Sequence, residues 1–505
     1  MFRQARPVCR GRSLHADPRR GQPPSMTHGV TLVSALGTVM PPDSQTIVSR
    51  GVGSPGIRTR PTADRFAVSE VAVGSATRCE PPAKLPLPGA GATISSLTTG
   101  GNFGGMAHAP IMDPIGLGVV GLGRAFTLLR PAFLADPRFA LVAAADPRPA
   151  ARAAFAAEFG GRTYSDAATL AADPAVAAVY VATPHQCHAA DACILAAAGK
   201  HVLVEKPMAL DLAEADAMID AAQSAGVQLI VGPCHSFDAP ILLARALIAS
   251  GRYGRLRMLQ MCTYTDFLYR PRRAEELDTA RGGGVVFNQA PHQVDIARLL
   301  GGGMLASLSA QCAAWDGTRP TEGAYSALLR FQDGAFASLT YSGYGHFDTD
   351  SIAGWIGEDG RRKDPDAQGA ARRRLAAVGA GGEAALRAAR GYGGAGNPVA
   401  YLQEALGPAA HPHFGLLIAS CEAADLLPTP TGVAVHADTT RDFIATPPPD
   451  PPRREVLDAL FAAVTEGRAP SQTGEWGRAT LEACHAILRS AREGRGIALV
   501  RQVPA

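Results

Sequence analysis

Short aliphatic runs alternate with longer amphipathic segments along the chain from residue 113 to residue 231. A short aliphatic run bounded by turn residues is typical of a strand buried in a parallel sheet, and a longer segment with a period of about 3.6 predicts a helix. Strands are expected at 115–120, 139–145, 178–182, 202–204 and 228–231, and helices at 125–134, 149–159, 166–172, 188–198 and 212–224. This alternation predicts an α/β fold with a parallel, right-handed, doubly wound sheet.

The rest of the chain has a different pattern, in which strands follow one another with few helices between them. Helices are expected at 241–250, 285–300, 453–466 and 476–493, and strands at 256–265, 305–313, 324–331, 335–341, 414–421 and 432–436. These strands are expected to be antiparallel, so this half is predicted to be α+β. The stretch 357–396 is rich in Ala, Arg and Gly and has two helical patches, 372–378 and 383–390, and we interpret it as a helical insertion placed to cover a cleft.

Residues 1–112 lack a sustained period and are rich in Gly, Pro, Ser and Arg. We interpret them as a disordered extension or as a misassigned start, with Met106 and Met112 as alternative starts. A targeting peptide is the competing interpretation, but residues 1–24 lack the apolar segment of a secretory signal. The predicted domains are therefore 1–112, 113–235 and 236–505.

The composition argues against several classes of protein. Residues 1–112 carry twelve Lys or Arg against five Asp or Glu, so the net charge of +3 conceals a mildly acidic remainder that gives no reason to expect a nucleic-acid partner. No run of eighteen apolar residues occurs, so no membrane span is expected. The nine cysteines include no C-x-x-C pair, which favours a cytoplasmic location and argues against disulfides or a cysteine-based zinc site, and no metal is expected.

A Gly-Leu-Gly turn at residues 121–123 follows the first expected strand, and Asp146 ends the second strand about twenty residues later. Glycines let the backbone approach a pyrophosphate at a helix N-terminus, and a carboxylate at that distance can accept hydrogen bonds from ribose hydroxyls. The usual third glycine would fall at Phe126, so we expect looser packing of the helix on the strand. The residues assigned to this dinucleotide site are Gly121, Leu122, Gly123, Arg124 and Asp146.

The carboxylate of Asp146 would repel a 2′-phosphate and accept hydrogen bonds from a free ribose diol, which favours NAD over NADP. Arg148 lies two residues further on and could pair with a 2′-phosphate, so NADP stays the alternative cofactor.

Two further expected strands end in polar residues. The strand 202–204 stops at Glu205 and Lys206, and the strand 178–182 leads into Thr183-Pro-His-Gln-Cys-His. Ligands bind beyond the carboxyl ends of the strands in open α/β sheets, so these residues should face one crevice. Lys206 would deliver an ammonium group there, unless it forms a surface ion pair. The cofactor-binding candidates are Arg148, Thr183, Pro184, His185, His188 and Glu205, although capping and turn packing are an alternative role for the histidines.

The helix expected at 285–300 carries Asn288, His292 and Asp295 after three glycines. Spacings of four and three residues place these side chains on one helical face, as in a ligand site or in a satisfied buried network. Glycines that let a backbone approach a ligand favour the site. The loop before the glycines contains Arg270, Arg272 and Arg273, which could bind carboxylates in bidentate fashion or form a solvated basic loop.

Together these motifs resemble the glucose–fructose oxidoreductase/inositol dehydrogenase/MocA family over residues 114 to 500. The resemblance implies an N-terminal Rossmann domain, and a C-terminal α+β domain whose large open, mostly antiparallel sheet often forms a homo-oligomer. It also implies hydride transfer between a nicotinamide and a carbinol or carbonyl. Family members commonly have Asp where this chain has Asn288, so Lys206 and His292 are the expected proton-transfer groups and Asn288 an orienting residue. The motifs that carry the resemblance are Gly118–Gly123, Ala182–His188, Glu205–Pro207, Gly282–Asp295 and Ile487–Gly494.

Within the family the chain is most similar to phthalate 4,5-cis-dihydrodiol and 4,5-dihydroxyphthalate dehydrogenases, through Gly121–Phe126, the 269–273 loop and the insertion. This implies a role in phthalate degradation, with a small aromatic-acid cis-dihydrodiol as substrate and with the three arginines and Asp295 contacting it. An inositol-type sugar or polyol dehydrogenase is one alternative. A catalytically silent nucleotide-binding sensor or repressor is another, although the presence of both Lys206 and His292 speaks against it.

Overall fold

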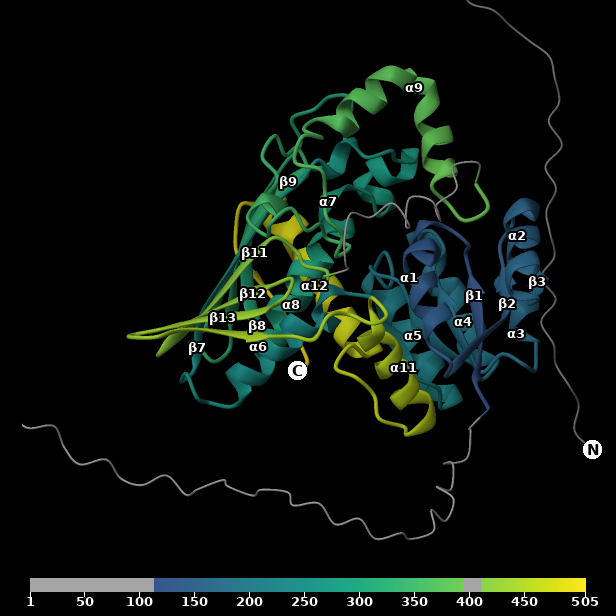
Figure 1. Ribbon diagram of the computed structural model, residues 1–505, viewed down its shortest axis with the longest axis horizontal. Coiled ribbons are helices and arrows are strands. Elements are labelled where there is room, and N and C mark those ends of the chain that lie inside the picture. The colour runs from purple at the N-terminus through teal and green to yellow at the C-terminus, as the bar shows by residue number, and fades with distance from the viewer. Residues whose placement is uncertain (1–112, 395–409) are drawn as a thin grey trace, which may run out of the picture. The chain divides into compact units, whose positions relative to one another are not determined.

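The computed structural model of the chain describes residues 113–394 and 410–505, and all of these belong to one compact unit (Figure 1). The predicted extension 1–112 and the last two residues of the predicted insertion lie outside the described residues. No described helix is long and apolar enough to cross a membrane, and the described residues include no group of three or more His, Cys, Asp or Glu side chains placed to hold a metal ion.

The first domain is a six-stranded sheet in which every neighbouring pair is parallel, with the order β3-β2-β1-β4-β5-β6. The chain moves outward from β1 to β3 and then returns to β4, so the strand order reverses between β1 and β4. Ligands bind at such a switch point, beyond the carboxyl ends of the strands. The strands are β1 (Ile115–Val120), β2 (Phe139–Ala145), β3 (Arg162–Tyr164), β4 (Ala178–Val181), β5 (His201–Val204) and β6 (Leu229–Val231). The predicted doubly wound sheet is confirmed, and β3 is an addition at its edge.

Helices cover both faces of this sheet. One face packs against α3, α4 and α5 through Leu170, Leu195 and Met218, and the other against α1, α2 and α11 through Leu129, Phe155 and Leu457. The helices of this domain are α1 (Arg124–Ala135), α2 (Pro149–Phe159), α3 (Ala167–Ala171), α4 (His188–Ala197) and α5 (Leu212–Ala225). Helix α11 (Arg454–Thr465) comes from the C-terminal part of the chain, which therefore returns to the first sheet.

The second sheet has nine strands in the order β14-β13-β12-β11-β7-β10-β9-β8-β15. All neighbouring pairs are antiparallel except β7 and β10, so the predicted mostly antiparallel sheet is confirmed. Its strands are β7 (Leu256–Tyr264), β8 (Leu305–Ala313), β9 (Ala324–Phe331), β10 (Phe336–Ser342), β11 (Leu416–Cys421), β12 (Ala424–Thr429), β13 (Gly432–Ala437), β14 (Arg441–Ala445) and β15 (Ile497–Ala498). Strands β12, β14 and β15 were not predicted, because charged, proline or short segments obscure their alternation.

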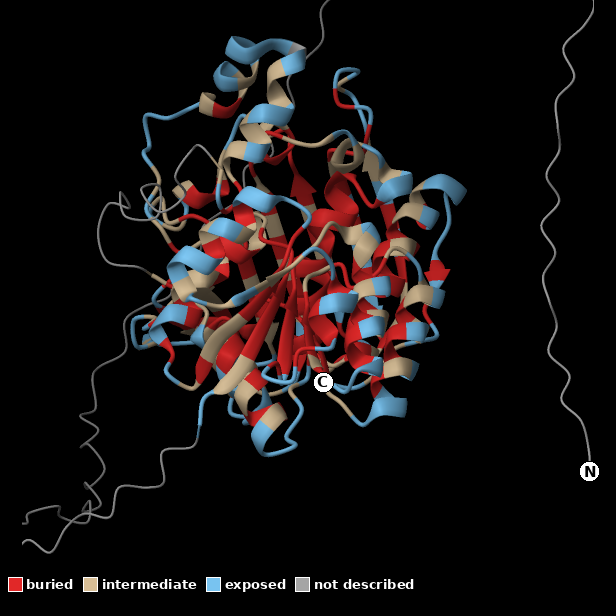
Figure 2. Ribbon diagram, turned by 90° about the vertical axis from the view of Figure 1, so that its right-hand side faces the viewer, coloured by how far each residue is buried: buried red, intermediate tan, exposed pale blue. Residues whose placement is uncertain are grey.

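Helices α6 (Ala239–Ala249), α8 (Ala290–Leu300) and α12 (Gly474–Glu493) pack on one face of this sheet. Leu259, Leu329 and Leu339 on that face are fully buried, whereas Leu328 and Phe443 are about half exposed. Buried residues line the strands and the helix surfaces that face them, while outer helix surfaces are exposed (Figure 2). The short 3₁₀ helices are η1 (His185–Cys187), η2 (His235–Phe237), η3 (Phe267–Tyr269), η4 (Ala274–Leu277), η5 (Thr279–Arg281) and η6 (Thr349–Ser351).

The predicted helix 285–300 is two helices, α7 (Gly284–Asn288) and α8, separated at Gln289, whose φ is −122°. Pro291 has no N–H to bond the carbonyl four residues earlier, so a continuous helix would lose a hydrogen bond there. The insertion forms α9 (Ala370–Ala389), which is bent at Gly379, as the two predicted helical patches suggest. Because of the break at Gln289, Asn288 and His292 lie on different helices rather than on one face.

Candidate active site

A cavity of about 650 Å³ lies at the carboxyl ends of the parallel strands, between the two domains. All of the predicted site residues line it except Leu122 and Asp295. Those that line it are Gly121, Gly123, Arg124, Asp146, Arg148, Thr183, Pro184, His185, His188, Glu205, Lys206, Arg270, Arg272, Arg273, Asn288 and His292.

The glycine turn has the geometry that a dinucleotide site requires. Gly121 has a φ of +93°, and a Cβ there would lie 2.7 Å from backbone atoms of Ala182 and Thr183. Any residue other than glycine at position 121 would therefore be strained in its backbone conformation and would clash with neighbouring backbone atoms. The looser packing expected at Phe126 is not observed, because its ring is fully buried and contacts that of Tyr392 edge to face at 5.1 Å. These features fit a pyrophosphate at the N-terminus of α1.

Asp146 ties the end of β2 to the turn. Its Oδ2 accepts a hydrogen bond from the backbone N–H of Leu122 at 2.8 Å, and its Oδ1 accepts one from Arg148 Nε at 2.9 Å. Burial alone would raise the pKa of this carboxyl, but the hydrogen bonds from Arg148 and Leu122 lower it. The carboxylate is thus ionised and placed to accept hydrogen bonds from a ribose diol, with Arg148 beside it.

Lys206 extends from the end of β5 to the second domain. Its Nζ donates a hydrogen bond to the backbone carbonyl of Asn288 at 2.7 Å. Burial lowers the pKa of Lys206, and although the charge of Glu205 opposes this effect, the positive charge of Arg453 adds to it. Glu205 is held by the hydroxyl of Tyr180 at 2.6 Å. A lysine with a lowered pKa can act as a general base.

His292 stands on the first turn of α8 and is 8% exposed. Its Nδ1 is buried and has no hydrogen-bond partner among the described residues. Burial, followed by the positive charge of Lys206, lowers the pKa of His292 well below its ordinary value. Its ring contacts those of His235 at 4.8 Å and Phe414 at 4.9 Å between centroids. The imidazole is therefore neutral and able to accept a proton.

The side chains of Asn288 and Asp295 differ from the predicted arrangement. The amide of Asn288 donates to the carbonyl of Gly284 at 2.7 Å, so the backbone rather than the side chain of this residue meets Lys206. The structure does not bring Asp295 to the cavity, because its two carboxylate oxygens accept hydrogen bonds from Trp476 and Ser236. Asp295 joins α8 to α12, since a buried carboxylate needs such donors.

The two predicted histidines at the end of β4 have structural contacts. The ring nitrogens of His188 lie 2.9 Å from the carbonyls of Pro207 and Thr183, and the side chain is fully buried. His185 Nδ1 lies 3.1 Å from the carbonyl of Gly282, and burial lowers the pKa of His185 to about 3. These residues hold the turns around Lys206 in place, which corresponds to the packing role considered for them.

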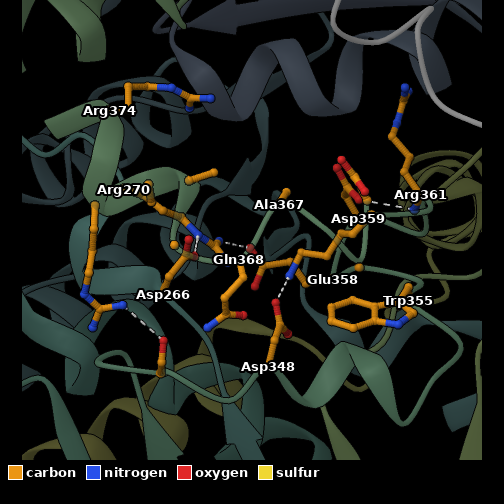
Figure 3. Close-up of a pocket in the computed structure, with 18 of the residues that line it drawn as sticks. Asp266, Arg270, Asp348, Trp355, Glu358, Asp359, Arg361, Ala367, Gln368 and Arg374 are labelled. Carbon is orange, nitrogen blue, oxygen red and sulfur yellow. Dashed lines mark hydrogen bonds and ion pairs between the residues drawn. The ribbon is translucent and has the colours of Figure 1, made fainter. Parts of the chain in front are cut away.

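The three loop arginines differ in their partners. Arg270 pairs with Asp266 and Glu358, and it lines a second cavity of about 460 Å³ in which both acids also lie (Figure 3). Arg273 pairs with Glu275 at 2.7 Å.

The guanidinium of Arg272 forms no ion pair with a carboxylate among the described residues, although the charge of Glu276 acts on it. Its guanidinium donates to the carbonyl of Phe267 at 2.7 Å and lies 3.5 Å from the centroid of that ring. Burial lowers the pKa of Arg272 to about 9. A charge in this position is available to an anionic ligand.

Among the cavity residues that were not identified from the sequence are His235, Phe267, Phe414 and Arg453. His235 could have been found, because it follows the strand expected at 228–231 just as Lys206 follows its own strand. The others carried no local signal. Arg453 adopts a left-handed conformation with a φ of 65° just before α11, and it reaches the cavity because the chain returns to the first sheet. A non-glycine residue in this conformation is uncommon and often marks a functional site.

A Rossmann sheet with a glycine turn, a carboxylate at the end of its second strand, and a lysine and a histidine in the same cavity is typical of a nicotinamide-dependent oxidoreductase. The model of the oxidoreductase family with the NAD-binding Rossmann fold matches residues 115–233, and that of the GFO/IDH/MocA C-terminal domain matches residues 241–361. The chain belongs to the GFO/IDH/MocA family and is an NAD-dependent dehydrogenase.

Relatives of known sequence and structure agree with this assignment. The chain is 47% identical over 378 residues to the 1-carboxy-3-chloro-3,4-dihydroxycyclohexa-1,5-diene dehydrogenase of Comamonas testosteroni, a match that covers 74% of this chain and 94% of the relative. A solved protein from Bordetella bronchiseptica RB50, named as a dehydrogenase, is 37% identical with a TM-score of 0.72, over 76% of this chain and all of that one. The WlbA dehydrogenase from Bordetella pertussis, solved with NADH and UDP-GlcNAcA, shares the fold at 24% identity and a TM-score of 0.54, over 77% of this chain and 99% of that one.

Proposed function

We propose that this protein oxidises a ring-carboxylated cis-dihydrodiol, of the phthalate 4,5-cis-dihydrodiol type, with NAD as hydride acceptor. The observation that carries the proposal is Arg272, a half-buried cation whose guanidinium forms no ion pair with a carboxylate among the described residues, in the same cavity as Lys206 and His292. The name of the Comamonas relative describes a substrate with one ring carboxylate and two adjacent hydroxyls. A cavity that holds a cation and two proton acceptors fits such a molecule.

The cavity also suits a planar ring. Phe267 and Phe414 line it, and Arg272 lies over Phe267 while Phe414 contacts His292. A carboxylate bound to Arg272 would place the attached ring along these aromatic side chains, with its hydroxyls toward His292 and Lys206. A second carboxylate, as in a phthalate-type substrate, would have to draw Arg270 or Arg273 away from its present acidic partner. The site therefore provides one strong carboxylate position and two that depend on rearrangement.

The chemistry requires removal of the hydroxyl proton as hydride leaves the carbinol carbon. The neutral amine of Lys206 accepts this proton, and neutral His292 shares it. The carbonyl of Asn288 orients the Lys206 amine. Bound NAD supplies the hydride acceptor, and residues 121–123, Arg124, Asp146, Arg148, Thr183, Pro184, His185, His188 and Glu205 would surround it. The hydroxyketone formed from a cis-dihydrodiol then tautomerises to a catechol, and the aromatisation draws the reaction forward.

Initial rates with NAD+ test this proposal. The cis-dihydrodiols of benzoate and phthalate should be oxidised with much higher kcat/KM than the cis-dihydrodiol of benzene, which has the same ring and hydroxyls but no carboxylate. Inositol and levoglucosan serve as polyol controls. Equal kcat/KM for the benzene and benzoate diols would show that the enzyme does not recognise the carboxylate. A higher kcat/KM for a polyol would reject cis-dihydrodiols as the substrate class.

We also propose that the second sheet forms a homo-oligomer through the face opposite its helices. The strand register places Phe443, Leu427, Ile418 and Leu328 in one row across this face, with the smaller or polar Ala434, Gln260 and Ser338 between them. Phe443 and Leu328, at the ends of the row, are 53% and 48% exposed. Large exposed apolar side chains in a row are typical of an interaction surface. Sedimentation gives the oligomeric state of the wild type and of Leu328→Lys. The wild type should be oligomeric and the variant should dissociate, and a monomeric wild type would contradict the proposal.

A further inference from the structure

A further histidine, His235, lines the cavity beside His292. His235 lies in η2, just after β6, and is 5% exposed. Its Nδ1 is 2.7 Å from the Oδ2 of Asp238, which is equally buried. A carboxylate can only accept a hydrogen bond, so Nδ1 carries the proton and Nε2 is the nitrogen that is free to accept another. The pair has the arrangement in which a carboxylate fixes the orientation and tautomer of a histidine.

His235 is in direct contact with the proposed proton-transfer group. The rings of His235 and His292 meet edge to face, with 4.8 Å between centroids and 68° between planes. The buried Nδ1 of His292 lacks a hydrogen-bond partner among the described residues. The charged or titratable groups with which His235 interacts are Asp238, His292 and Glu358, and Glu358 belongs to the segment before α9. His235 therefore has one acid partner on its own segment, one imidazole on α8 and one acid across the cavity.

The rest of the proton-transfer site lacks such a carboxylate. Position 288 is an asparagine whose amide is bound to Gly284, and Lys206 meets only its backbone carbonyl. Glu205, the acid next to Lys206, is bound to Tyr180, and Glu358 is bound to Arg270. Among the described residues that line the cavity, His235 is the one histidine paired with a carboxylate. His292 is disfavoured as a cation by burial and by the charge of Lys206, so a proton placed on it needs an acceptor nearby.

We propose that His235, oriented by Asp238, is a further catalytic residue that takes the substrate proton from His292 and releases it from the cavity. The inference rests on the proposed roles of Lys206 and His292. In each turnover the carbinol C–H bond breaks and its electron pair leaves as hydride to the nicotinamide. The O–H bond breaks and the C=O bond forms, and the proton passes to Lys206 or His292, then to Nε2 of His235, and finally to solvent. One carbinol and one NAD+ thus give one carbonyl compound, one NADH and one H⁺.

The surroundings of Asp238 offer a route outward. Glu455 of α11 is close enough to Asp238 for their charges to interact, and its side chain is 22% exposed. Burial, with repulsion from Asp238 as a smaller contribution, raises the pKa of Glu455. His411 Nδ1 lies 3.9 Å from Glu455 Oε1. The titratable groups thus continue from the cavity to the edge of α11.

The test compares the full-length wild type with His235→Asn, which keeps a donor toward Asp238 but cannot carry a proton, and with His235→Ala. Both variants should bind NADH with unchanged affinity and lose kcat by roughly 10²-fold, as general acid–base groups do. Added imidazole should restore activity to His235→Ala, because the small base can occupy the space left by the side chain. Asp238→Asn should lose less kcat than either His235 variant and should change the dependence of kcat on pH. The matched control is His413→Asn, a buried histidine that also lies near a carboxylate, Asp350, but does not line the cavity.

These rates are measured with whichever carbinol of the dihydrodiol and polyol panel the wild type oxidises best. A preference for polyols would reject the proposed substrate and still leave the role of His235 to be decided, because every carbinol must lose its hydroxyl proton. A wild-type kcat in His235→Asn, or a loss in His235→Ala that imidazole does not relieve while melting and NADH binding are normal, would overturn the inference. An equal loss in His413→Asn would show that the effect is structural, and this too overturns it.

Discussion

The Nζ of Lys206 and the backbone carbonyl of Asn288 are 2.7 Å apart, which joins the end of β5 to the end of α7 across the two domains. The contact depends on the break at Gln289, because in a continuous helix this carbonyl would accept an intrahelical N–H four residues on. The break therefore supplies a free acceptor at the place where the lysine needs orientation.

Replacing Lys206 with Ala should lower kcat by at least about 10²–10⁴-fold, because no amine then accepts the hydroxyl proton. Lys206→Arg is the matched control, since arginine keeps a donor toward Asn288 but stays protonated, and it should be equally inactive. Steady-state rates and NADH fluorescence titrations check this. Activity close to wild type in either variant would show that the lysine is structural.

His292→Ala should lose kcat on the order of 10²-fold while NAD binding is retained. The reason is that the neutral imidazole, which lines the same cavity as Lys206, shares the proton, whereas Lys206 alone can still accept it. The acid end of the pH–rate profile should change together with kcat, because the pKa of His292 lies well below 6.5. If the profile of the variant matches that of the wild type, His292 is not on the proton path.

The rate should rise with pH and level off below 10.5, the ordinary pKa of lysine, because burial lowers the pKa of Lys206 and the base form is therefore populated at lower pH. His292 should add no rise near pH 6.5, since its pKa lies well below that value. Arg453→Gln removes a positive charge that lowers the pKa of Lys206, so it should move the rise to higher pH. The pH profiles of kcat/KM for the wild type and for Arg453→Gln test the direction of this shift. A rise that moves to lower pH in the variant would contradict the prediction.

Arg272→Ala should raise KM for the carboxylated diol by about 10–100-fold, the equivalent of one charge-assisted hydrogen bond of roughly 1.5–3 kcal/mol. KM for the benzene diol should change little, because that substrate has no carboxylate. Arg273→Ala is the comparison, and its effect should be smaller since Arg273 is already paired with Glu275. Equal effects of Arg272→Ala on both substrates would show that the residue acts by packing on Phe267.

The wild type should use NAD in preference to NADP, because the ionised carboxylate of Asp146 repels a 2′-phosphate. Asp146→Ser removes this repulsion and also releases Arg148, whose Nε is 2.9 Å from Asp146 Oδ1. The ratio of kcat/KM for NAD to that for NADP should therefore fall sharply in the variant. A wild type that prefers NADP would contradict this prediction and would indicate that Arg148 binds the 2′-phosphate.

The parallel sheet, the glycine turn and the position of Lys206 could be predicted from the sequence alone. Buried strands, amphipathic helices and turn glycines leave periodic signals over a few residues, and the carboxyl ends of parallel strands necessarily converge on one edge. Lys206 and the 121–123 turn therefore had to share a cavity once the strand order was known. The edge strands β3, β14 and β15 were missed because charged residues or a length of only two or three residues hide the alternation on which the prediction depends.

The partners of the polar side chains were decided only by the tertiary structure. Asp295 has the spacing of a cavity residue, yet it binds Trp476, which lies 181 positions further along the chain. Arg270, Arg272 and Arg273 are neighbours in sequence, but two of them are paired with acids and one is not. Local periodicity reports whether a position is buried, whereas the charge that a buried group meets depends on distant segments, as Arg453 and His235 show in the same cavity.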